Sequence, residues 1–474
     1  MTTTHVTPTS RPETGREVAV PSQPADASGA TAAPEQLRLV VAGSVDDGKS
    51  TLVGRLLHDT KNILADTFDS MVAASTSRGA DTVDLALLTD GLRAEREQGI
   101  TIDVAYRYFS TPQRTFVLAD TPGHVQYTRN MVTGASTADA AVILVDVRHG
   151  VSAQTRRHAA LMALLRVPHV VFALNKMDAV DWSEERFDEV ARDTRDLVEK
   201  VGLAGDVAVV PLSALTGEGV VASAPSWYEG EPLLTLLENL PVARDLRVEN
   251  FRMPVQLVIR PRTSDHPDYR GMAGRITSGV VHVGDVVRAS TLGLGSRVIG
   301  IDTPTGSAQE AGAGESVTIR LADELDVARG DVLVVESEAD APDVTSELKG
   351  VVAWLAEGST TPRQRVLVKA GTKVVRAVLT DVTHHWDVEE STWHPADGAH
   401  SLGLNDIGQV VLHLAEPVAV DAYSRHRGTG AFLVIDPASG ATIGGGMVGA
   451  DLGLGAQAAG EEPEEESEED WLAG

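Results

Sequence analysis

The sequence predicts an α/β domain with a phosphate-binding loop, followed by two small antiparallel β-barrels. Three observations support this fold class. An apolar run at 37–42 leads into a glycine-rich loop at 43–50, which opens a helical pattern. Later apolar runs end in short polar motifs, as expected where parallel strands present ligand groups at one edge of a sheet. From 253 onward, short apolar runs alternate with glycine turns, which is typical of small barrels.

The glycine-rich loop is a candidate phosphate cradle. Glycines at both ends let successive backbone N–H groups curve around phosphates, the lysine supplies a positive charge, and the serine hydroxyl can bind Mg²⁺. A glycine turn before a helix can be purely structural, but the flanking strand and helix favour phosphate binding. The residues predicted to form this part of the site are Gly43, Ser44, Val45, Asp46, Asp47, Gly48, Lys49, Ser50 and Thr51.

A second motif follows the apolar run 116–119. A carboxylate at the end of a buried strand can face the phosphate loop and hold the magnesium shell, and a glycine N–H can sense the terminal phosphate of a bound nucleotide. The predicted site residues here are Asp120, Thr121, Pro122, Gly123 and His124.

Two further strand ends carry a candidate base-recognition motif. The Asp178 carboxylate can accept two hydrogen bonds from guanine, through N1–H and the exocyclic amine, whereas adenine has an acceptor at N1 and cannot offer two neighbouring donors. This motif therefore favours GTP over ATP. An isolated Asn-Lys-x-Asp string is a weak signal, but its order after the two earlier motifs makes it strong. The predicted base-site residues are Asn175, Lys176, Asp178, Ser213, Ala214 and Leu215.

Together the motifs resemble the translation-factor group of GTPases. Elongation factors of the Tu type carry His and Arg where this chain has Asp47 and Gln98, and these differences, with the strings 90–103 and 126–131, make the chain similar to the large GTPase subunits of bacterial sulfate adenylyltransferases. The resemblance runs from about 37 to 447. It implies two β-barrels in an arrangement like that of elongation factor Tu.

The resemblance also implies roles for individual residues. Thr101 matches the switch threonine that reaches Mg²⁺, and His124 matches the residue that orients the attacking water. Lys49, Thr101 and His124 are thus the expected catalytic residues, and GTP and Mg²⁺ the expected cofactors. The expected metal-binding residues are Ser50, Thr101 and Asp120.

The implied activity requires a partner. In the family, GTP hydrolysis drives formation of adenylylsulfate and diphosphate from ATP and sulfate on a small subunit of the ATP-pyrophosphatase type. No second phosphate loop of this pattern occurs in the sequence, so it shows no recognisable ATP site and no fused adenylylsulfate kinase is expected. Two alternatives remain open: a translational GTPase that carries aminoacyl-tRNA, and a scaffold that binds GTP without hydrolysing it.

Composition indicates which class of partner and which cellular compartment to expect. The formal charge is −28, from 40 Lys and Arg against 68 Asp and Glu, which argues against nucleic acid as a partner. There is no cysteine and the N-terminus has no apolar core segment, so we expect a cytoplasmic protein without a signal peptide or membrane span. The predicted organisation is a disordered tail at 1–34, a GTPase domain at 35–245, β-barrels at 250–345 and 348–450, and an acidic disordered tail at 451–474.

Overall fold

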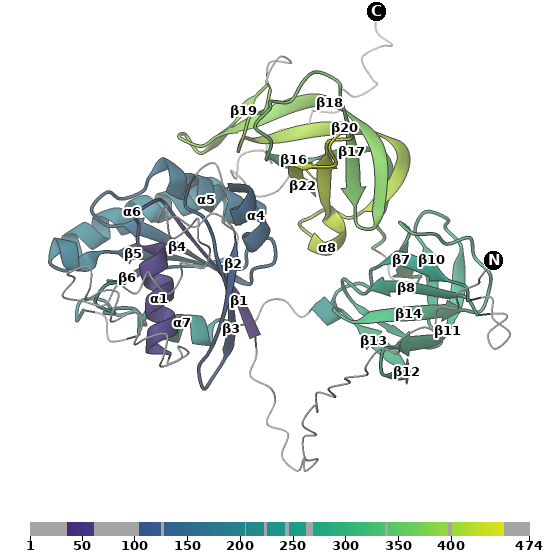
Figure 1. The fold of residues 1–474 in the computed structure, drawn as a ribbon, viewed down its shortest axis with the longest axis horizontal. Helices are drawn as coiled ribbons and strands as arrows, with labels where there is room; N and C mark the ends of the chain where they lie inside the picture. The colour runs from purple at the N-terminus through teal and green to yellow at the C-terminus, as the bar shows by residue number, and fades with distance from the viewer. Residues whose placement is uncertain are drawn as a thin grey trace, which may run out of the picture. The chain divides into compact units, whose positions relative to one another are not determined.

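The structure is a computed structural model, shown as a ribbon in Figure 1. It describes residues 36–60, 104–124, 128–203, 205–221, 225–241, 246–261, 269–336, 340–396 and 401–449. Several expectations lie outside these ranges, namely those for both tails, for Gln98 and for Thr101.

A six-stranded sheet forms the centre of the N-terminal domain. In sheet order its strands are β2 (Ala105–Ser110), β3 (Thr115–Asp120), β1 (Gln36–Gly43), β4 (Ala140–Asp146), β5 (His169–Asn175) and β6 (Asp206–Pro211). From β3 to β6 neighbouring strands run parallel, whereas β2 lies antiparallel to β3 at the edge. Every residue of β4 and β5 is buried, as expected for parallel strands covered on both faces.

Helices cover both faces of this sheet (Figure 1). They are α1 (Lys49–Asp59), α4 (Thr128–Ala135), α5 (Ala153–Leu164), α6 (Glu184–Val201) and α7 (Leu233–Asn239), with short 3₁₀ turns η3 (Met177–Val180) and η4 (Leu246–Val248). Successive strand residues point to opposite faces, so β1 sends Val40 to the core under α4, α5 and α6, and Val41 to the core under α1 and α7. These two cores hold the strand ends, and hence the motifs, in place.

The first β-barrel closes through six strands. In order they are β10 (Val286–Ala289), β15 (Val332–Val335), β7 (Met253–Ile259), β8 (Gly271–Arg275), β14 (Ser316–Leu321) and β11 (Gly295–Thr303), and β11 pairs back with β10. Strand β12 (Gly306–Ala308) extends the sheet beyond β11, and β9 (Val280–His282) pairs with β13 (Glu310–Gly312). Alternate strand residues fill a core of their own.

The second β-barrel closes in the same way. Its strands are β17 (Gln364–Ala370), β21 (Ala431–Ile435), β22 (Thr442–Val448), β16 (Asp343–Trp354), β20 (Ile407–Val420) and β18 (Lys373–Asp387), with β18 paired back to β17. Strand β19 (Thr392–Pro395) extends β18, and the short helix α8 (Arg427–Gly430) precedes β21. The predicted fold class, an α/β domain followed by two antiparallel β-barrels, is confirmed. Across the described ranges, no helix combines the length and apolar character needed to cross a bilayer.

Candidate nucleotide site

The predicted motifs meet at one edge of the six-stranded sheet. The phosphate loop follows β1, Asp120 ends β3, Asn175 ends β5, and Ser213 lies just beyond β6. Because these strands run parallel and adjacent, their carboxyl ends lie side by side, which is where open α/β sheets place ligands. Chain segments more than a hundred residues apart thereby form a single site.

The phosphate loop is folded around its own lysine. The Lys49 ammonium donates to the carbonyls of Gly43 at 2.9 Å and Ser44 at 2.6 Å. The Asp47 carboxylate accepts from the Ser44 N–H at 2.6 Å, which fixes the turn of the loop. Burial lowers the pKa of Lys49, opposed by the charges of Asp47 and Asp120, and burial raises the pKa of Asp47. The Lys49 ammonium is therefore enclosed by the loop and shielded from solvent.

Two glycines keep this cradle open. A Cβ atom on Gly123 would lie 2.2 Å from the Lys49 ammonium, and one on Gly48 would lie 2.4 Å from the Asn175 amide nitrogen. Gly48 also has a φ of 96°, in the left-handed region that favours glycine. It immediately precedes α1, which begins at Lys49, two residues earlier than the sequence pattern predicted. It offers no side chain to cap the helix, so the first N–H groups of α1 suit an anionic ligand.

The second motif, at 120–124, lies beside the phosphate loop and forms the next part of the candidate site. Asp120 is buried at the end of β3, and the Thr121 hydroxyl donates to the Val41 carbonyl at 2.7 Å, tying the motif to β1. Gly123 is buried and His124 partly buried directly after it. Oxygen ligands of the kind that Mg²⁺ prefers thus come from Ser50 and Asp120 on two adjoining segments.

The base motif connects three segments through Asn175. Its amide nitrogen donates to the Asp47 carbonyl at 2.7 Å, and its amide oxygen accepts from the Ala214 N–H at 2.9 Å. Lys176 has a φ of 68° and its ammonium donates to the Asp46 carbonyl. Both side chains therefore fix the position of the phosphate loop relative to the base site.

The remaining base-site residues line the same edge. Asp178 lies in η3 and is partly buried, and within the described ranges no hydrogen bond or ion pair of its carboxylate is found. The Ser213 hydroxyl accepts from the Thr216 N–H at 3.2 Å, and Leu215 is exposed. The structure thus brings together all the predicted residues that it describes.

Among the residues that the structure describes, two at the site were missed by sequence reasoning. Arg55 of α1 donates to the carbonyls of Ala214, at 3.2 Å, and Leu215, and so buttresses the base loop; an arginine in a helix gives no sequence signal for this. Asp146 ends β4, the strand between β1 and β5, and pairs with Lys176 at 2.9 Å. The sequence did contain an indication of Asp146, because this carboxylate stands at the end of a fully apolar run.

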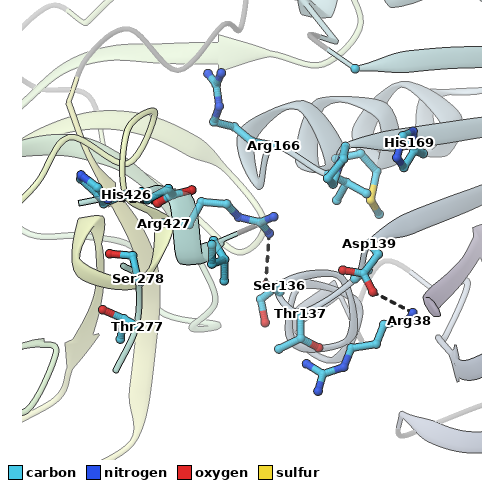
Figure 2. A pocket seen from close by; sticks show the side chains of 18 of the residues that line it. Arg38, Ser136, Thr137, Asp139, Arg166, His169, Thr277, Ser278, His426 and Arg427 are labelled. Carbon is cyan, nitrogen blue, oxygen red and sulfur yellow. Dashed lines mark hydrogen bonds and ion pairs between the residues drawn. The ribbon is translucent and has the colours of Figure 1, made fainter. Parts of the chain in front are cut away.

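A large cavity lies away from this site. It has a volume of about 920 Å³, and its lining includes Arg38, Asp139 and His169, which lie near the amino ends of β1, β4 and β5. Figure 2 shows Arg427 of α8 reaching the Ser136 carbonyl across it, at 3.3 Å. Since the nucleotide motifs follow the carboxyl ends of the strands, the cavity is at the opposite edge of the sheet.

Within the described part of the chain, one cluster outside the motifs has metal-ligating side chains. Ligand atoms of Asp340, Asp421 and His426 lie within 4.8 Å of one another. However, Arg252 contacts the Asp421 carboxylate through two nitrogens at 3.1 Å, and Arg425 contacts Asp340 at 2.6 Å. These guanidinium groups already neutralise the carboxylates, so the cluster is an ion-pair network that disfavours a cation.

The fold and the site define a GTP-binding protein of the elongation factor Tu class. The family described as elongation factor Tu GTP binding domain matches residues 35–243, and the family described as GTP-eEF1A C-terminal domain-like matches residues 347–449. More particularly, the chain belongs to the family of sulfate adenylyltransferase subunit 1.

Close relatives cover most of the chain. It is 46% identical over 417 residues to sulfate adenylyltransferase subunit 1 of Teredinibacter turnerae, and 48% identical over 419 residues to that of Methylorubrum populi, covering 87% of each chain in both cases. It is also 46% identical over 419 residues to the bifunctional enzyme CysN/CysC of Mycobacterium tuberculosis, covering 88% of this chain and 67% of that protein. Among solved structures, sup35 complexed with GDP matches 88% of this chain and 94% of that chain, at a TM-score of 0.39 and 23% identity.

Proposed function

We propose that this chain is the GTPase subunit of a sulfate adenylyltransferase. GTP hydrolysis on this chain drives the formation of adenylylsulfate and diphosphate from ATP and sulfate on a partner subunit. The observation that carries the proposal is identity of 46–48% with relatives named sulfate adenylyltransferase subunit 1, over 87% of both chains. The convergence of the phosphate loop with Asn175 and Asp178 at one sheet edge supports GTP as the nucleotide.

The predicted site residues divide the binding of GTP among them in this proposal. Backbone N–H groups of the phosphate loop and the start of α1 hold the phosphates, with Lys49 as the point charge. Ser50, Asp120 and Thr101 would hold Mg²⁺, and the ion would supply positive charge beside the phosphates. Asp178 selects guanine, with Lys176 along the base plane and the backbone of 213–215 at its O6 edge.

His124 is proposed to orient the attacking water. Phosphoryl transfer passes through a loose transition state, so alignment and charge stabilisation contribute more than proton abstraction. The position of His124 directly after Gly123, whose neighbour across the site is Lys49, supports this role.

We further propose a small subunit of the ATP-pyrophosphatase type as the partner, in the cytoplasm. The words "subunit 1" in the relatives' names support a multisubunit enzyme. The absence of cysteine from the sequence fits a reducing compartment, and the charge of −28 disfavours nucleic acid. The limits proposed for the domains are 35–245, 250–345 and 348–450.

Reconstitution tests the proposal. The purified chain alone should hydrolyse GTP slowly and make no adenylylsulfate from ATP and sulfate. Adding the small subunit should yield adenylylsulfate in a GTP-dependent way and accelerate hydrolysis, with partner-stimulated GTPases gaining up to about 10⁵-fold. Lys49→Ala should abolish both effects, whereas Lys200→Ala, on the exposed end of α6, should not.

Two outcomes would contradict the proposal. Equal adenylylsulfate yields with GTP and with a non-hydrolysable analogue would refute coupling of the two reactions. Tight GTP-dependent binding of aminoacyl-tRNA, with no adenylylsulfate formed, would instead place the chain among the translational GTPases.

A further inference from the structure

Asp146 contacts two cationic side chains beside the nucleotide site, although none of the nucleotide motifs contains it. Its side chain is 4% exposed at the end of β4. The carboxylate contacts the Lys176 ammonium at 2.9 Å and the Arg148 guanidinium at 2.6 Å. A buried carboxylate with two cations is costly unless each contact is satisfied, so this arrangement restricts where both cations can lie.

The contact with Arg148 is geometrically specific. The Arg148 Nε lies 3.0 Å from one Asp146 oxygen and Nη2 lies 2.6 Å from the other, a bidentate pair, and the Arg148 backbone N–H adds a third hydrogen bond at 3.0 Å. Burial opposes ionisation of Asp146, but the hydrogen bonds from Arg148 and Lys176 outweigh it and hold the pKa of this carboxyl well below its usual range. Asp146 is therefore a fixed negative charge.

The same two cations matter to the base site. The Lys176 ammonium also donates to the Asp46 carbonyl of the phosphate loop, so its stem spans from the base motif to the loop. Arg148 is close enough to Asp178 for the two charges to interact, yet the guanidinium is bonded to Asp146. Within the described ranges the Asp178 carboxylate has no hydrogen bond or ion pair, which leaves both oxygens available to a base.

We propose that Asp146 is a positioning residue for guanine recognition. It anchors Lys176 between the base motif and the phosphate loop, and it retains Arg148 so that this guanidinium does not pair with Asp178. Without Asp146, Arg148 becomes a competitor for the oxygens that accept from guanine. The proposal rests on the guanine-binding part of the proposed function and is independent of the partner and of adenylyl transfer.

The test is a comparison of GDP affinities in the isolated full-length chain, measured by titration of a fluorescent GDP analogue. Asp146→Ala should weaken binding on the order of 100-fold, because two charge-assisted contacts lose their anchor. Adding Arg148→Ala to that variant should restore affinity by about tenfold, because the competitor is removed. Arg148→Ala alone should change affinity less than about threefold.

Controls separate positioning from general damage. Asp206→Asn removes an aspartate charge at the amino end of β6, whereas the nucleotide motifs follow the carboxyl ends of the strands. The Asp206 side chain is 82% exposed, and the substitution should leave GDP affinity unchanged. In saturating GTP, the hydrolysis rate of Asp146→Ala should stay near wild type while KM rises, as expected for a residue that acts on binding alone. If the alanine variant does not fold, Asp146→Asn, with and without Arg148→Ala, provides the same comparison.

Two results would overturn the inference: wild-type GDP affinity in Asp146→Ala, or a double variant that binds GDP no better than the single one. A merely structural role for Asp146 predicts the second result, since removing Arg148 would then restore nothing. Failure of adenylylsulfate synthesis in the reconstituted enzyme would refute the proposed function and leave these affinities unaffected.

Discussion

A buried histidine next to the nucleotide site should make the N-terminal domain sensitive to acid. His158 of α5 is 1% exposed, and its Nε2 lies 2.9 Å from the Gln154 amide nitrogen. Arg157 donates to the Gln154 amide oxygen at 2.8 Å, which orients the amide so that its N–H₂ faces the imidazole. The imidazole Nε2 therefore accepts, and a proton added there would meet a donor.

The magnitude follows from the shift in protonation. Burial, followed by the charges of Lys49 and Arg157, lowers the pKa of His158 from 6.5 to about 3. Because the folded pKa lies below the unfolded value, the unfolded state binds more protons, and stability is lost as pH falls below 6.5. At pH 5, protonation of His158 in the unfolded state lowers the free energy of unfolding by about 2 kcal/mol, since each pH unit below 6.5 contributes about 1.4 kcal/mol. This is a factor of roughly 30 in the folding equilibrium.

Hydrogen exchange in α5 measures this directly. Between pH 7 and pH 5, after correction for intrinsic exchange, protection of the α5 amides should fall by about 30-fold in the wild type. In His158→Gln, whose amide oxygen can still accept from Gln154, this extra fall should be absent. His149→Gln, at a side chain that is 76% exposed, is the matched control and should retain it. Equal pH dependence in wild type and His158→Gln would refute the reasoning.

Three further predictions concern the nucleotide site. Asp178→Asn should cost about 2–4 kcal/mol in GTP affinity, with partial recovery by xanthosine triphosphate, because an amide donor would face the guanine N1–H; undiminished GTP binding in a titration would exclude Asp178 from base recognition. His124→Ala should leave GTP binding nearly intact and slow single-turnover hydrolysis by about 10²-fold; hydrolysis at the wild-type rate would remove His124 from the site. Gly123→Ala places a Cβ 2.2 Å from the Lys49 ammonium, so it should weaken GTP binding and hydrolysis together; an unchanged nucleotide affinity would contradict this geometry.

The sequence alone determined the fold class and the kind of ligand. Apolar runs that end in polar motifs identify parallel strands, and short runs with glycine turns identify barrels, because periodicity reflects which faces are buried. The order of the phosphate loop, Gly123 and Asp178 along the chain was enough to predict a guanine nucleotide. Such motifs can be recognised in a sequence because each one contacts the ligand through the backbone and a few side chains of one short segment.

Only the tertiary structure decided how the motifs are held together. Asn175 connects Asp47 to Ala214 because β1, β4, β5 and β6 lie side by side in the sheet, an order that no local pattern specifies. Asp146 likewise contacts Lys176 only because β4 and β5 pair in a register that aligns their last residues. Sequence patterns record what each segment buries and which groups it carries, whereas contacts between distant segments depend on strand order and register, which are set by packing of the whole domain.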